Sequence, residues 1–133
     1  MVRDSAPGTL GARVSRTLPP CRKRWNCVCS RDDGLRRHRI KPFDSPEDPD
    51  AAFARLRRLV ADTPRTRVLA AEDGYLHARC RTRIGFVDDL ELLLCRQQGV
   101  IHVRSASRIG IYDFGVNRRR VERLRRRFEG GFS

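Results

Sequence analysis

The stretch that decides the fold is residues 67–107, RVLAAEDGYLHARCRTRIGFVDDLELLLCRQQGVIHVRSAS. It contains four segments that alternate between apolar and polar residues or are nearly all apolar, and turns rich in Gly, Asp and Gln separate them. The predicted strands are 67–71, 75–84, 86–95 and 100–107, and the predicted turns are 72–74, 85 and 97–99. Because these turns are too short for a crossover connection, neighbouring strands are expected to be antiparallel.

Two amphipathic helices are predicted on either side of this stretch. The first can begin at Ser45 or at Asp48, since a proline follows each of them, and Thr63-Pro64 ends it. The second begins near Asn117, which is expected to cap it, and ends at Gly130-Gly131. Both helices carry an apolar stripe at helical spacing, formed by Phe53, Leu56, Leu59 and Val60 in the first and by Val121, Leu124 and Phe128 in the second.

A short edge strand at 38–43 is predicted ahead of the first helix, and Pro42, which has no N–H group, restricts that strand to an edge. The predicted fold class is therefore α+β: a five-stranded antiparallel sheet with both helices on one face, in the order β-α-β4-α. This order is similar to the TATA-binding-protein-like or helix-grip arrangement, a likeness of fold that carries no function. Residues 1–25 are expected to form a flexible basic tail, and residues 26–133 a single domain.

The formal net charge of the 133 residues is +13, and it is concentrated at the two ends of the chain. Residues 1–41 carry a net charge of +8, residues 42–103 of −1 and residues 104–133 of +6. Such a distribution is typical of proteins that bind nucleic acid or another anionic surface. However, 27 of the 29 basic residues are Arg, a skew that a GC-rich coding sequence also produces, so a merely solvated, arginine-rich surface is the alternative.

No run of 18 apolar residues is present, and Met1 to Pro20 has no apolar segment of the kind found in secretory signals, so neither a spanning helix nor export is expected. The five cysteines are Cys21, Cys27, Cys29, Cys80 and Cys95. An odd number of cysteines without a signal favours a cytoplasmic protein over a disulfide scaffold. Cys80 and Cys95, on neighbouring strands, are expected to lie close together as small hydrophobic residues.

A zinc site is the other interpretation of the first three cysteines, with His38 as a further ligand. The spacing C-x5-C-x-C lacks the C-x2-C pair and the second ligand pair that are typical of structural zinc sites. We therefore expect no metal and no other cofactor.

The start of the last helix carries three cations where the helix dipole disfavours them. Arg118, Arg119 and Arg120 lie in its first turn, and each costs about 0.3–1 kcal/mol there. Either a bound phosphate, carboxylate or other acidic head group compensates them, or an internal network does, through Asp113 or the acidic group Asp88, Asp89 and Glu91. On the first interpretation the ligand-binding residues are Arg104, Ser105, Ser107, Arg108, Asp113, Asn117, Arg118 and Arg120.

The polar face of the predicted sheet is a second candidate site. Arg79, Arg81 and Arg83 are expected opposite Asp89 and Glu91, with His102 and Arg104 beside them. This face is either exposed and stabilised by cross-strand ion pairs, or a ligand cleft in which His77 or His102 carries a proton. No spacing typical of a nucleophile and its base is present, so no catalytic residue is assigned.

Strict alternation turns Asp88 inward. A buried carboxylate needs a partner, so Asp88 is expected to pair with an arginine such as Arg104 or Arg108, unless a bulge rotates it outward.

Three blocks resemble a known family. They are RSASRIGIYDFGVNRRR at 104–120, GFVDDLELLL at 85–94 and NCVCS at 26–30. Together they resemble the family called domain of unknown function 1499, from about Asn26 to Phe128. The resemblance supports the fold and implies no activity, because none is established for the family. Cys29 departs from the family pattern, in which a small polar residue is expected.

Three functions are compatible with these observations. The first is a non-enzymatic accessory or binding module that holds an anionic small molecule or an acidic protein at the arginine-rich strand-to-helix turn. The second is a nucleic-acid-associated basic protein, in which Trp25, Tyr112 and Phe114 are the aromatic residues near the basic ends. The third is a small hydrolase-like enzyme. The oligomeric state does not follow from the sequence.

Overall fold

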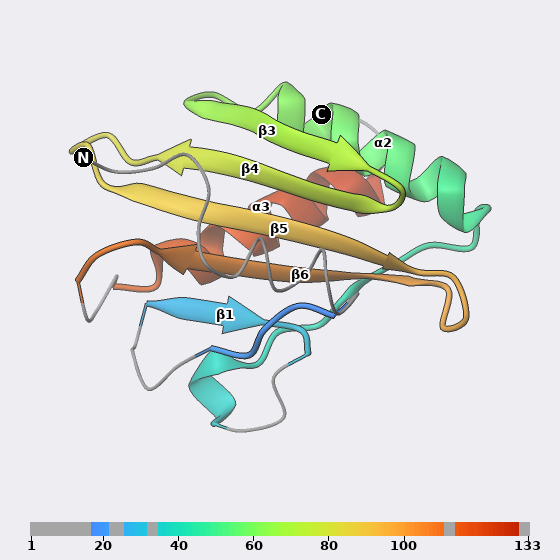
Figure 1. Ribbon diagram of the computed structural model, residues 1–133, viewed down its shortest axis with the longest axis horizontal. Coiled ribbons are helices and arrows are strands. Elements are labelled where there is room, and N and C mark those ends of the chain that lie inside the picture. Colours follow the sequence, from blue (N-terminus) through green and yellow to red (C-terminus); the bar gives the residue numbers. More distant parts are fainter. Residues whose placement is uncertain (1–16, 22–25, 32–34, 111–113, 131–133) are drawn as a thin grey trace.

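The structure, a computed structural model, describes residues 17–21, 26–31, 35–110 and 114–130, which form an antiparallel sheet with two helices on one face (Figure 1). The strands are β1 (Cys27–Cys29), β2 (Phe43–Asp44), β3 (Thr66–Glu72), β4 (Tyr75–Arg81), β5 (Val87–Cys95) and β6 (Val100–Ser107). The helices are α2 (Pro49–Ala61) and α3 (Val116–Gly130), and a 3-10 turn, η1, spans Arg36–His38. The α+β fold class is confirmed.

The sheet order is β1-β6-β5-β4-β3, and β2 also pairs with β6. The first strand of the chain therefore lies beside the last one, which brings the two basic ends of the sequence together. The expected edge strand at 38–43 is wrong in detail: its beginning belongs to η1, and only Phe43 pairs with β6. The pairing of β1 with β6 was not predicted, because three residues are too few to show an alternating pattern.

Helix α2 begins at the second of its two predicted starts. The carboxylate of Asp48 accepts the N–H of Ala51 at 3.1 Å, and Pro49 occupies the first helical position. Ser45 instead donates its hydroxyl to Glu47 at 2.9 Å. In α3, Asn117 was predicted to cap the helix, but it lies inside the helix and is fully buried.

The main core lies between the sheet and the two helices. Strand alternation directs Leu76, Leu92 and Val103, which face one another across β4, β5 and β6, toward the helices. Both predicted apolar stripes are packed against this side of the sheet, with Leu56 and Val121 fully buried. No helix among the residues described here is long and apolar enough to cross a membrane.

The other side of the sheet, which we call the helix-free face, is polar but is not exposed. It carries His77, Asp89 and Glu91, which are only 1%, 2% and 0% exposed. The interpretation of this face as an exposed surface is therefore wrong, although the cross-strand ion pairing that it expected is present between Arg104 and Glu91. Part of its cover is the segment 17–21, where Leu18 is 2% exposed and packs in a cluster with Cys29, Tyr75 and Leu93.

Residues 17–21 were expected to belong to a flexible tail, and for these residues the expectation is wrong. Besides the burial of Leu18, a disulfide joins Cys21 to Cys27 in β1. The rest of the expected tail, residues 1–16 and 22–25, lies outside the described part of the chain.

Cys80 and Cys95 do not lie close together. Cys80 faces the helices opposite Asp88, whereas Cys95, at the other end of β5, is paired with Val100 and belongs to the opposite face. Their distance follows from the register of β4 on β5, which the sequence pattern did not fix.

The role of residues 17–21 can be tested with Leu18→Ala. Because Leu18 is buried, we expect the free energy of unfolding to fall by about 2–5 kcal/mol, as for other core leucines. The matched control is Leu35→Ala, because Leu35 is 49% exposed and its loss changes stability by only about 0.5 kcal/mol. Urea denaturation measures the free energy of unfolding of both variants. Equally small losses would support the prediction that residues 17–21 belong to a flexible tail.

Candidate functional site

The three arginines at the start of α3 have different partners. Arg120 donates to a carboxylate: its Nη2 lies 2.6 Å from Asp88 Oδ2. Arg118 donates to two backbone carbonyls, those of Arg37 and Arg39, at 3.0 and 2.8 Å. Arg119, which is exposed, donates to the carbonyl of Phe114 at 2.7 Å. The protein itself therefore supplies the negative charge or dipoles that these cations require.

A buried network surrounds the Arg120–Asp88 ion pair. Arg120 Nη1 also donates to Asn117 Oδ1 at 2.8 Å, and the Ser105 hydroxyl donates to the same oxygen at 2.7 Å. The Asn117 amide donates to Ser107 Oγ and to the Asn26 carbonyl, each at 3.0 Å. Because these residues belong to β5, β6, α3 and the position just before β1, the network fixes the strand-to-helix turn, as the internal-network interpretation predicts.

The eight predicted ligand-binding residues do not line one common pocket. Ser105, Ser107, Asn117 and Arg120 lie together between sheet and helix, in the network just described. Arg104 and Arg108 lie on the helix-free face, because β6 alternates and the even-numbered residues face away from α3. Arg118 points toward residues 37–39, and Asp113 lies outside the described residues. Asp88 was expected to pair with Arg104 or Arg108; it does pair with an arginine, but with Arg120.

On the helix-free face, Asp89 has two basic neighbours. Arg108 binds both of its oxygens at 2.8 and 2.9 Å, and His77 Nε2 lies 2.7 Å from Oδ1. Burial acts to raise the pKa of Asp89, but the hydrogen bonds from His77 and Arg108 outweigh it and hold the pKa below its ordinary value. This carboxylate is therefore charged and satisfied, which is typical of a structural ion pair.

Glu91 is less well satisfied. The Tyr75 hydroxyl donates to its Oε2 at 2.6 Å, while Arg104 Nη1 is 3.5 Å from Oε1. Within the described residues, neither Oε1 nor Nε of Arg104 has a hydrogen-bond partner. Burial raises the pKa of Glu91 above its ordinary value by more than Tyr75 and Arg104 lower it.

The two histidines considered as proton carriers are both buried on this face. His77 contacts Asp89, and His102 lies between Ser30 and Gln98 at 3.0 and 2.9 Å. Burial, together with the charge of Arg31, lowers the pKa of His102 below its ordinary value. Neither histidine lines either of the cavities described next.

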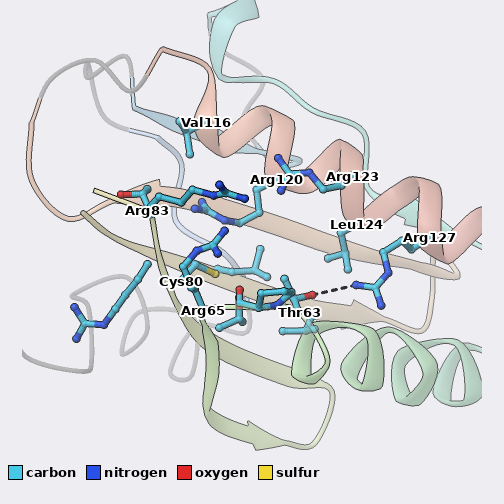
Figure 2. Close-up of a pocket in the computed structure, with 15 residues that line it drawn as sticks. Thr63, Arg65, Cys80, Arg83, Val116, Arg120, Arg123, Leu124 and Arg127 are labelled. Atoms are coloured by element: carbon cyan, nitrogen blue, oxygen red, sulfur yellow. Dashed lines mark hydrogen bonds between the residues drawn. The ribbon is translucent and has the colours of Figure 1, made fainter. Parts of the chain in front are cut away.

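A cavity of about 200 Å³ lies between the end of α2, the end of β4 and one face of α3 (Figure 2). Its apolar wall includes Val60, Leu90 and Leu124, and its arginines are Arg65, Arg81, Arg83, Arg120, Arg123 and Arg127. No Asp or Glu is among the residues of the described chain that line it. We call it the arginine cavity. In Figure 2 the guanidinium groups of Arg65, Arg83 and Arg120 extend toward the same end of it.

Most of these arginines are not neutralised. Arg120 pairs with Asp88, and Arg127 Nη1 donates to Thr63 Oγ1 at 3.3 Å. The other four are exposed, and their side chains form no hydrogen bond or ion pair with the part of the chain that the structure describes; they are Arg65, Arg81, Arg83 and Arg123. Burial raises the pKa of the Cys80 thiol, which also lines the cavity, and Arg120 opposes that shift. The thiol is thereby kept protonated, and so is a poor nucleophile.

Of the cavity's arginines, only Arg120 was among the eight predicted ligand-binding residues. Arg81 and Arg83 were predicted on the polar face of the sheet, and they line this cavity instead. One signal was available in the sequence: Arg120, Arg123 and Arg127 follow one another at intervals of three and four, which places them on one face of a helix. The contributions of Arg65 and Arg83 depend on how the loops before β3 and after β4 approach α3, which no local pattern specifies.

A second, open groove of about 1180 Å³ lies between residues 36–44 and α3. Arg118 and Arg125 cross it by donating to backbone carbonyls, Arg125 to those of Lys41 and Pro42 at 2.6 and 2.9 Å. Its basic lining residues are Arg36, Arg37, Arg39, Lys41, Arg118 and Arg125, and its acidic ones are Asp44, Glu122 and Glu129.

No group of three or more potential metal ligands was found in the described residues, and Cys21 and Cys27, considered as zinc ligands, are joined to each other.

The Arg120–Asp88 pair can be tested with Arg120→Met. This change leaves the Asp88 carboxylate buried without its cation, so we expect a loss of about 3–5 kcal/mol in the free energy of unfolding. Arg126→Met, on the exposed side of the same helix, is the control. In the double variant Asp88→Asn/Arg120→Met part of the loss should be recovered. A loss in Arg120→Met no larger than in the control contradicts the role of the pair.

Glu91 predicts a pH dependence. Because burial raises its pKa in the folded state, the folded protein retains that proton where the unfolded chain has lost it. The wild type should therefore become less stable relative to Glu91→Gln as the pH rises above 4.5 through the folded pKa. Urea midpoints between pH 4 and 8 measure this, with the exposed Glu129→Gln as a control that should parallel the wild type. A constant difference between wild type and Glu91→Gln contradicts the assignment.

Comparison with known proteins adds one match. A family model described as "Protein of unknown function (DUF1499)" matches residues 17–128, which begin in the packed segment ahead of β1 and end in α3. Neither the search of curated proteins nor that of solved structures found a match. The likeness to the TATA-binding-protein-like or helix-grip arrangement therefore stays a prediction. Since the match covers most of the chain, the protein belongs to the DUF1499 family.

Proposed function

We propose that this protein is a non-enzymatic binding module for a small anionic ligand, which it holds in the arginine cavity. The observation that carries the proposal is the lining of that cavity: six arginines and no acidic residue among its described members. The arginine cavity thus lies next to the strand-to-helix turn where the sequence predicted an anion. Arg120 belongs to both the predicted site and this cavity.

Charge and geometry both support an anion. Four exposed guanidinium groups at the rim have no carboxylate partner in the described chain, so their mutual repulsion is relieved when an anion binds. A guanidinium group presents parallel N–H donors that match the oxygens of a carboxylate or phosphate. Three separate segments contribute these groups: the residue before β3 carries Arg65, the end of β4 and the turn after it carry Arg81 and Arg83, and α3 carries Arg123.

The apolar wall narrows the class of ligand. Val60, Leu90 and Leu124 lie beneath the arginines, so the ligand should carry a compact apolar group as well as its charged head. The volume, about 200 Å³, is below the roughly 300–1,000 Å³ of sites for drug-sized molecules. A ring or short chain bearing one phosphate or carboxylate therefore fits this cavity better than a nucleotide does.

An enzymatic role has less support. The histidines considered as proton carriers lie across the sheet from the cavity, and the Cys80 thiol in it is held protonated. A cytoplasmic location stays a prediction, and the Cys21–Cys27 disulfide weighs against it because disulfides are typical of oxidising compartments.

Association with a polyanion such as nucleic acid is a second candidate, and the open groove favours it. The side chains of Arg36, Arg39 and Lys41 on its wall are exposed and form no hydrogen bond or ion pair with the described residues, although their backbone groups do. No described aromatic residue lines the groove for base stacking, so contacts there would be to phosphates and strongly dependent on salt. An acidic protein, which is negatively charged like nucleic acid, is a further candidate partner for this groove.

Thermal shift and calorimetric titration test the first proposal with three probes at matched ionic strength: inorganic phosphate, phenyl phosphate and benzyl alcohol. Phenyl phosphate should raise the melting temperature most, because it has both the charged head and the apolar group. In Arg83→Gln or Arg123→Gln its Kd should rise about tenfold or more, since a charged hydrogen bond contributes roughly 1.5–3 kcal/mol. Arg126→Gln, whose exposed side chain is on α3 outside the cavity, should bind as the wild type does.

A DNA oligonucleotide, titrated at two salt concentrations in the same experiment, separates the candidates. If oligonucleotide binding falls steeply with salt and phenyl phosphate has no effect, the open groove rather than the arginine cavity is the anion-binding site. Equal losses in Arg123→Gln and Arg126→Gln would show that only overall charge matters, and would contradict the proposed site.

A further inference from the structure

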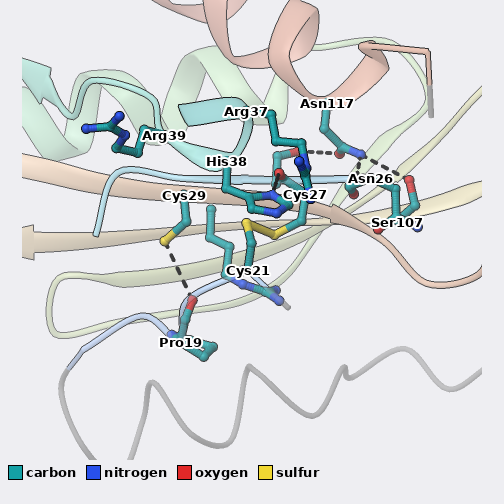
Figure 3. Close-up of a disulfide and its surroundings, with 12 residues drawn as sticks. Pro19, Cys21, Asn26, Cys27, Cys29, Arg37, His38, Arg39, Ser107 and Asn117 are labelled. Carbon is teal, nitrogen blue, oxygen red and sulfur yellow. Dashed lines mark hydrogen bonds between the residues drawn. A yellow bond between two sulfur atoms is a disulfide. The ribbon is translucent and has the colours of Figure 1, made fainter. Parts of the chain in front are cut away.

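The segment 17–21 is attached to the sheet by a disulfide. We call this segment the strap. Cys21, at its end, is bonded to Cys27 of β1 (Figure 3). The strap has no regular secondary structure, so no ladder of strand hydrogen bonds holds it in place. Its position depends instead on the covalent bond, on side-chain packing and on individual hydrogen bonds such as that from Cys29 Sγ to the Pro19 carbonyl.

The packing of the strap covers a third cysteine. Cys27 and Cys29 lie on the same face of β1, two residues apart. The Cys29 thiol is 0% exposed and lies 3.6 Å from the carbonyl oxygen of Pro19 in the strap. Leu18 packs in the same cluster, against Tyr75 and Leu93. Cys29 is thus a reporter of whether the strap is in place.

The strap also leads to two incompletely hydrogen-bonded ionisable residues of the described chain, Glu91 and Arg104. Tyr75, in contact with the Leu18 cluster, donates its hydroxyl to the fully buried Glu91. Next to Glu91 is Arg104, and both residues have a buried polar atom without a hydrogen-bond partner among the described residues. Because burial of such groups is unfavourable, this face gains hydration when the strap leaves it.

We propose that Cys21 and Cys27 form a redox-responsive latch, which keeps the strap on the helix-free face when oxidised and releases it when reduced. Burial of one leucine does not offset the backbone entropy of ordering five residues that lack regular hydrogen bonding. The disulfide, which ties Cys21 to the sheet, reduces that entropic cost. This latch is independent of the anion site, which lies on the other side of the sheet.

The chemistry is thiol–disulfide exchange with a dithiol reductant. A thiolate of the reductant attacks the sulfur of Cys21, which is more exposed than that of Cys27. The Cys21–Cys27 bond breaks, and Cys27 leaves as a thiolate that takes up a proton. The second thiolate of the reductant then displaces Cys21 from the mixed disulfide. Two electrons pass to the protein, and the reductant becomes a cyclic or paired disulfide.

The three free cysteines provide a test within one molecule. Cys29 lies under the strap, Cys80 is buried under the helices and Cys95 is half-buried. Native alkylation with iodoacetamide, followed by peptide mapping, measures the rate at each. In the oxidised protein only Cys95 should react readily. After treatment with dithiothreitol, alkylation of Cys29 should accelerate at least about tenfold while Cys80 stays protected, because only the strap has opened.

Reduction also creates thiols at Cys21 and Cys27, which react with iodoacetamide themselves. The variant Cys21→Ser/Cys27→Ser lacks these thiols, so it shows the effect of strap release on Cys29 alone. Its Cys29 should react as in the reduced wild type, with no further response to dithiothreitol. Cys95→Ser, which leaves the latch intact, should protect Cys29 as the wild type does. Hydrogen exchange in residues 17–21 should accelerate in parallel with Cys29.

Three results would overturn the latch. One is an air-oxidised protein without a Cys21–Cys27 cross-link. Another is Cys29 remaining as protected in the double variant as in the oxidised wild type, since the strap then holds without its bond. The third is Cys29 and Cys80 becoming reactive together, because the disulfide then maintains the whole fold rather than the strap.

Discussion

Three buried carboxylates on the central strand β5 impose the constraint on which this structure depends. Asp88, Asp89 and Glu91 are all at most 2% exposed, and a charge removed from water to that extent must have a partner. Alternation along the strand sends Asp88 to one side of the sheet and the other two to the opposite side. Arg120 of α3 therefore has to approach from the helix side of the sheet, whereas Arg104 of β6 and Arg108, just after β6, approach from the helix-free face. The position of α3 and the charge on both faces follow from these pairings.

The same constraint separates stability from recognition. Arginines that pair with β5 are committed to the fold and lie on both sides of the sheet, which is why the predicted cluster of eight residues does not form one pocket. Arginines farther along α3 and at the ends of β3 and β4 have no such obligation in the described chain. They surround the arginine cavity, next to the buried ion pair that holds its rigid wall. Arg120 belongs to both groups, and so links the proposed binding site to the core.

Features of the fold and of the site were predictable from the sequence where they depend on residues close together in the chain, and not where they depend on distant residues. Local patterns predicted both helices, the hairpins of residues 67–107 and the pairing of Asp88 with an arginine. They did not identify Arg120 as that arginine, because 32 residues separate the two and only packing brings them together. Local patterns also favoured an exposed polar sheet face, since alternation distinguishes two faces but does not reveal what covers each one. Leu18 covers part of the polar face, and it belongs to a segment that its prolines and glycines predicted to be a flexible tail.

By itself, the sequence determined the α+β class, the antiparallel order of the hairpins and the excess of positive charge, because these depend on short-range periodicity, turn residues and composition. The tertiary structure alone decided that Cys21 meets Cys27, that the polar face is buried, and that unpaired arginines from three separate segments surround one cavity. Those outcomes depend on contacts between residues far apart in the chain or on loop conformations. Their free energy arises only when the whole sheet and both helices are in place.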